Sequence, residues 1–81
     1  MLRHVDEVLE IVAPIKALLA GKPPEIQGAV LAELLAVWLA GHHVAGDAEA
    51  TRKVRADLLA AHCHAVRLLT RTNAKILGTT P

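Results

Sequence analysis

The chain has 81 residues, with nine Lys or Arg, eight Asp or Glu and a formal net charge of +1, which excludes binding of nucleic acid or membranes through a strong overall field. Its only cysteine is Cys63, so no disulfide can form within it, and we expect a cytoplasmic protein. It is 53% apolar but has one Trp and no Phe or Tyr, so its core must consist of Leu, Val, Ile and Ala, which favours close helix packing.

The first predicted helix spans residues 2–20. Pro14 lies inside it and removes the amide that would bond to the carbonyl of Glu10, which predicts a kink at Pro14 or two short helices. Its apolar residues recur at spacings of three and four, as expected for one buried face. They are Leu2, Val5, Leu9, Val12, Ile15 and Leu19.

The second predicted helix spans residues 24–44. The preceding "GKPPE" ends the first helix and supplies Pro24 as a first-turn residue. From Gly28 to Ala40 the only charge is Glu33, and this apolar stretch is too short to cross a bilayer, so we expect a buried central helix. An isolated Glu can act as a general acid or base, but we favour a Glu33 that reaches solvent or pairs with a base.

The third predicted helix, residues 48–77, is the longest. Gly46 ends the second helix, Asp47 caps the third, and Gly78 terminates it, leaving a tail at 78–81. No strand signal appears, and the linkers are too short to separate domains. The sequence therefore predicts an all-α fold: a single domain over 1–81, built as a small up-down-up bundle of three helices with a long C-terminal helix.

The stretch "LLAAHCHAVRLL" places two histidines around Cys63. On a helix, residues two apart point in nearly opposite directions, so His62 and His64 cannot hold one metal ion together. We interpret Cys63 as a small half-buried apolar residue rather than a nucleophile. The sequence thus predicts no catalytic residue, metal ligand or cofactor, and we do not expect an enzyme.

The helical wheel of residues 48–77 places His64 on the polar face. The apolar face is crossed by three polar side chains, Arg55, His62 and Asn73. Since buried polar groups need partners, we expect His62 to be largely buried and hydrogen-bonded to protein.

Two alternatives to a pure interaction role follow from other residue groups. In an up-down-up bundle, His4 would come within about one turn of His42 and His43, and these three residues could form a metal site. A pocket around His62 could instead bind a small ligand. The basic residues of the third helix could also contact nucleic acid, although acidic residues share its face and no aromatic is interleaved.

The lengths of the helices predict self-association. A second helix of about 21 residues ends opposite about residue 67 of the third, so the last turns of the third helix have no partner within the chain. We therefore expect a homodimeric bundle, in which the chain acts as a self-associating interaction or regulatory module, with another protein as a further possible partner. The predicted interface consists of Arg55, His62, Leu69, Asn73, Ile76 and Leu77. A rival is a break near Thr70 that folds the end back.

Overall fold

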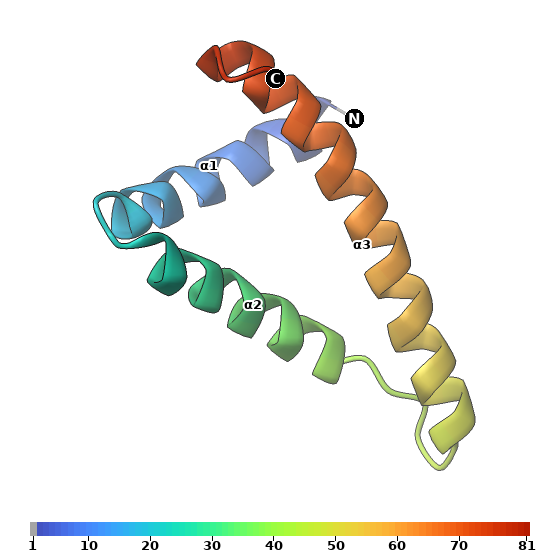
Figure 1. Ribbon diagram of the computed structural model, residues 1–81. Helices are drawn as coiled ribbons and strands as arrows, with labels where there is room; N and C mark the ends of the chain where they lie inside the picture. Colours follow the sequence, from blue (N-terminus) through green and yellow to red (C-terminus); the bar gives the residue numbers. More distant parts are fainter. Residues whose placement is uncertain (1) are drawn as a thin grey trace. The chain divides into compact units, whose positions relative to one another are not determined.

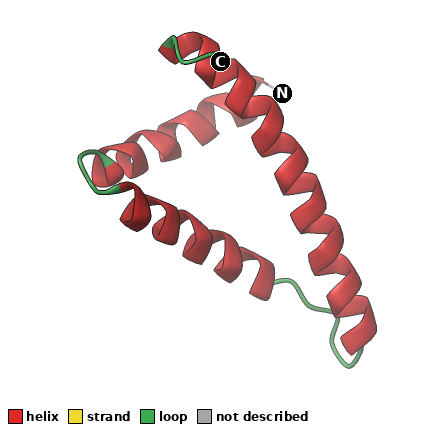
Figure 2. Cartoon of the chain, viewed as in Figure 1, coloured by secondary structure: helices red, strands yellow, loops and turns green. Residues whose placement is uncertain are grey.

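The computed structural model of the chain describes residues 2–81, with the side chains of residues 4–81. Helix α1 spans Leu2–Leu19, α2 spans Pro24–Ala40 and α3 spans Ala48–Leu77 (Figure 1). Residues 2–81 contain no strand, which confirms the predicted all-α class (Figure 2). The chain divides into two compact units, Met1–Leu34 and Leu35–Pro81.

The first unit contains α1 and the part of α2 from Pro24 to Leu34, joined by a tight turn. Gly21 adopts φ +76°, a left-handed conformation that ends α1 at little cost for a glycine. The Gln27 side chain donates from Nε2 to the carbonyl of Leu19 at 2.9 Å and so ties α2 to the end of α1. α1 runs through Pro14 as one helix, so the alternative of two short helices is wrong. A bend at Pro14 stays a prediction.

The second helix ends at Ala40, four residues earlier than the sequence predicts. Gly41 follows it, and the amide of His42 bonds to the carbonyl of Leu39 at 3.0 Å, a tightened last turn. The guanidinium of Arg55 bonds to the carbonyls of Ala40 and His42. These carbonyls are therefore satisfied by a distant residue, which the local sequence of α2 does not reveal.

The predicted bounds of α3 are confirmed at both ends. Asp47 accepts a hydrogen bond from the amide of Ala50 at 2.9 Å, as an N-cap does. At the other end Gly78 has φ +72°, and the amides of Gly78 and Thr79 bond to the carbonyls of Lys75 and Ala74, the Schellman arrangement. α3 is continuous through Thr70, so the rival break near that residue is wrong.

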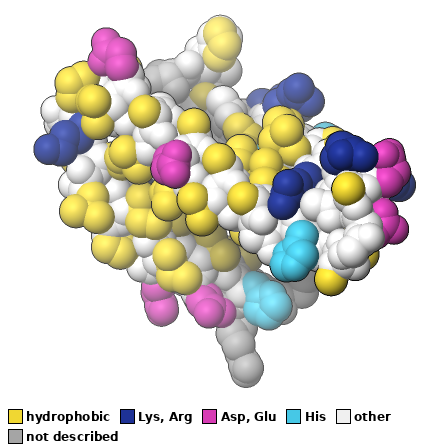
Figure 3. All heavy atoms as spheres, turned by 90° about the horizontal axis from the view of Figure 1, so that it is seen from below, with side chains coloured by type: hydrophobic (Ala, Val, Ile, Leu, Met, Phe, Trp, Pro, Cys, Tyr) yellow, Lys and Arg dark blue, Asp and Glu magenta, His cyan; other side chains and the backbone are white. Residues whose placement is uncertain are grey.

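Burial is the property in which the chain departs most from a globular domain. None of the side chains of residues 4–81 is buried, and the large apolar ones are widely exposed (Figure 3). The expectation that α2 is a buried central helix is therefore wrong for the single chain, since only Leu35 and Leu39 of its apolar residues are half-buried. α2 is apolar on all sides, so a single neighbouring helix can cover only part of its apolar surface.

Candidate interaction surface

One side of α3 carries four residues spaced seven apart. They are Arg55, His62, Leu69 and Ile76. Seven residues are almost two helical turns, so these side chains follow one line along the helix. Arg55 and His62, the first half of this line, make contacts within the second unit. Leu69 and Ile76, the second half, have exposed side chains.

Arg55 connects α3 to the end of α2. Its Nε donates to the carbonyl of His42 at 3.0 Å, and its Nη2 donates to the carbonyl of Ala40 at 3.1 Å. Arg55 is half-buried. This arrangement gives the basic side chain a partner on the apolar side of α3, so its presence there needs no second subunit.

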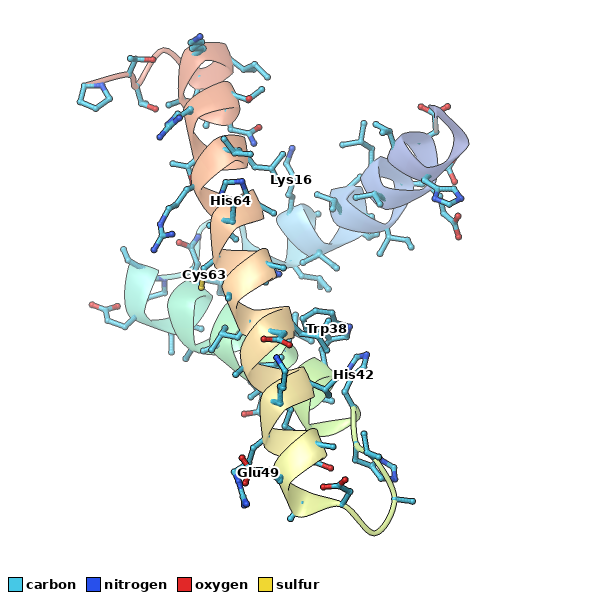
Figure 4. All side chains as sticks on the ribbon, turned by 90° about the vertical axis from the view of Figure 1, so that its right-hand side faces the viewer. Lys16, Trp38, His42, Glu49, Cys63 and His64 are labelled. Atoms are coloured by element: carbon cyan, nitrogen blue, oxygen red, sulfur yellow. The ribbon has the colours of Figure 1, made fainter. Side chains whose placement is uncertain are left out.

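A ring cluster lies next along the line. The Trp38 ring contacts the His42 ring edge-on at 5.2 Å between centroids (Figure 4). The Trp38 ring also contacts the His62 ring, at 5.8 Å between centroids. The His42 Nδ1 lies 2.7 Å from the carbonyl oxygen of Trp38, which fixes the orientation of the His42 ring. The cluster therefore joins the last turns of α2 to the middle of α3.

The expectation that His62 is buried and hydrogen-bonded is wrong for the single chain. His62 is exposed, and among the described residues its ring makes an aromatic contact but no hydrogen bond. Its aromatic contact is with Trp38, which is itself 43% exposed and so gives the imidazole little cover. His64 is exposed as expected.

Beyond His62 the same side of α3 is an open apolar groove of about 340 Å³. Leu69 is 58% exposed, Ile76 75% and Leu77 74%. The residues that line the groove recur at spacings of three and four. They are Val66, Leu69, Thr70, Asn73, Ala74, Leu77 and Thr79.

The polar groups of the groove bond to their own helix. Thr70 donates its hydroxyl to the carbonyl of Val66 at 2.7 Å, and Asn73 donates from Nδ2 to the carbonyl of Leu69 at 2.8 Å. The second N–H and the oxygen of the Asn73 side-chain amide make no hydrogen bond to any described residue. Asn73 therefore keeps one donor and one acceptor for a molecule in the groove.

The charges of α3 differ between its two halves. Arg52 pairs with Glu49 at 3.0 Å and Lys53 with Asp57 at 2.9 Å, both on the exposed surface. Residues 58–81 contain three Lys or Arg residues and no Asp or Glu. The pairing of Arg52 and Lys53 reduces the basic face that the sequence offers for nucleic acid.

The side chains of residues 4–81 include no group of three or more His, Cys, Asp and Glu that could hold a metal ion. His4 lies in the first unit and His42 and His43 lie in the second, so the alternative site of these three residues stays a prediction. Cys63 is half-buried and Glu33 is exposed, as expected for an apolar-like thiol and a solvated carboxylate.

Comparison with known proteins finds no match among family models, curated proteins or solved structures. In the described part of the chain, no helix has the length and apolar character needed to cross a bilayer. The function is therefore inferred from the chain's own residues and contacts.

The sequence prediction placed its interface residues on one side of α3 but missed that the two halves of this side differ in their contacts. The ring contact of His62 with Trp38 and the carbonyl partners of Arg55 were not part of the predicted interface. The spacing of Trp38 and His42, four apart near the end of a helix, was the available signal for the ring cluster.

Proposed function

We propose that this chain is a self-associating helical interaction module of the cytoplasm, whose function is carried by the surfaces of its assembled form. The observation that carries this proposal is the lack of any buried side chain among residues 4–81 in a chain that is 53% apolar. Apolar surface of this extent is a contact surface in soluble proteins.

The exposure of apolar side chains within each unit supports association with a second copy. Leu18 in the first unit is 74% exposed, and Leu69 and Ile76 in the second unit are 58% and 75% exposed. Burying such side chains against a second copy removes apolar surface from water, which favours association.

The helix lengths indicate why folding of one chain on itself is insufficient. Arg55 binds the carbonyl of Ala40, which sets these two residues at one level. α2 has 17 residues and rises about 24 Å to Pro24, so even a fully aligned α2 would reach no further than about Arg71 of α3. α1 turns into α2 at the same end. In that alignment the last turn of α3, with Ile76 and Leu77, would have no partner on α2.

A double substitution tests the proposal. Leu69→Asp with Ile76→Asp places two carboxylates on the second half of the α3 line, where desolvation on association is costly. We expect light scattering at micromolar concentration to show at least two chains for the wild type and a monomer or unfolded chain for this variant.

His64→Asp with Arg71→Asp is the matched control, because these residues lie on the opposite side of α3. The control should keep the wild-type mass. A wild-type mass of one chain, or equal dissociation of both variants, contradicts the proposal.

A further inference from the structure

The groove of α3 ends in a segment whose residue types read nearly the same in both directions. Around Asn73 the sequence is "LTRTNAKIL", with Leu69 and Leu77 four residues away on either side and Arg71 and Lys75 two residues away. In a two-fold contact between antiparallel helices, residues equidistant from the axis meet each other, so this pattern places Leu69 opposite Leu77 of the second copy when Asn73 lies on the axis.

The helix geometry separates the two kinds of residue in this pattern. Leu69 and Leu77 lie within about 40° of Asn73 around the helix, whereas Arg71 and Lys75 lie about 160° away. Two copies of α3 can therefore meet along the groove without bringing their basic side chains together. Neither Arg71 nor Lys75 forms an ion pair with a described residue, so both are available to solvent.

We propose that the groove of α3 receives α3 of a second copy in antiparallel orientation, with Asn73 on the two-fold axis. Leu69 then packs against Ile76 and Leu77 of the second copy, and these exposed side chains become the centre of the contact. The proposal rests on the self-association proposed above and specifies its contact and register.

Asn73 supplies the polar part of this contact. Its free N–H donates to the side-chain oxygen of Asn73 in the second copy. By symmetry, the free N–H of Asn73 in the second copy donates to the side-chain oxygen of Asn73 in the first. A polar side chain at one position of an apolar helical seam fixes register and number of chains at some cost in stability. The groove thus contains both an apolar contact and a polar residue that selects one alignment of the two helices.

Disulfide trapping tests the alignment. In a Cys63→Ser background, Asn73→Cys brings two thiols together on the axis, within the Cα separation of about 4–7 Å that a disulfide needs. We expect this variant to form a covalent dimer in oxidised glutathione at least about tenfold faster than Arg71→Cys in the same background. The native Cys63, about 15 Å along the helix from Asn73, should also cross-link slowly.

A second pair of variants keeps the test valid if Asn73→Cys fails to fold. In the same background, Leu69→Cys and Leu77→Cys should each cross-link slowly alone, because like positions lie about 12 Å apart along the axis. A mixture of the two proteins should cross-link readily.

Two results would overturn the alignment. If Arg71→Cys or native Cys63 cross-links as fast as Asn73→Cys, or the mixture is no faster than its components, while light scattering still shows a dimer, this contact is wrong and self-association stands. A monomeric wild type would contradict both the alignment and the proposed self-association.

Discussion

Arg55 joins the two helices of the second unit through its guanidinium. Arg55→Met keeps the aliphatic stem but leaves the carbonyls of Ala40 and His42 without their donors. We expect the free energy of unfolding to fall by about 1–2 kcal/mol, measured by urea unfolding at fixed protein concentration.

The matched control for this prediction is Arg67→Met. Arg67 lies on the same helix and makes no hydrogen bond or ion pair with a described residue. Its substitution should change the unfolding free energy by less than about 0.5 kcal/mol. Equal losses for both variants would show that Arg55 does not cap α2.

His62 contributes an aromatic contact rather than a hydrogen-bond network. His62→Leu should therefore leave stability unchanged or raise it slightly, because an apolar side chain packs well on the Trp38 ring. Trp38 is the only tryptophan, so its fluorescence reports the ring cluster that includes this contact. We expect a shift of its emission to shorter wavelength in His62→Leu and no shift in His64→Leu. A large loss of stability would instead reveal a polar role for His62.

Glycine stabilises the end of a helix but destabilises its interior. Gly78 has φ +72° at the end of α3, so Gly78→Ala should lower the free energy of unfolding by about 1 kcal/mol. Gly28 lies inside α2, and an added Cβ meets no atom within 4 Å. Gly28→Ala should therefore raise stability by about 0.5–1 kcal/mol. Thermal unfolding followed by circular dichroism measures both, and the same sign for the two would contradict these assignments.

The elements that could be predicted from the sequence are those whose ends are set locally. Asp47 and Gly78 each bond to backbone groups within five residues, and the bounds of α3 were predicted correctly. The end of α2 could not be predicted, since its last carbonyls bond to Arg55, fifteen residues from Ala40. A contact at that distance leaves no periodic signal in the sequence of α2.

At the scale of the whole molecule, the sequence indicated which side of α3 is apolar but not which part is already covered. Leu69, Asn73, Ile76 and Leu77 of the predicted interface remain open to a partner. Arg55 bonds within the chain and His62 contacts Trp38. This division depends on where α2 ends. The error in the predicted end of α2 and the missed division of the α3 face therefore have one cause.

The central claim is that this chain completes its core with a second copy. Sedimentation equilibrium of the wild type over a range of concentrations, with helix content followed by circular dichroism, tests it most directly. We predict a mass of at least twice 8.6 kDa at micromolar concentration, with loss of helix as the protein is diluted and dissociates. A species of 8.6 kDa that keeps its full helix content at every concentration would contradict the claim.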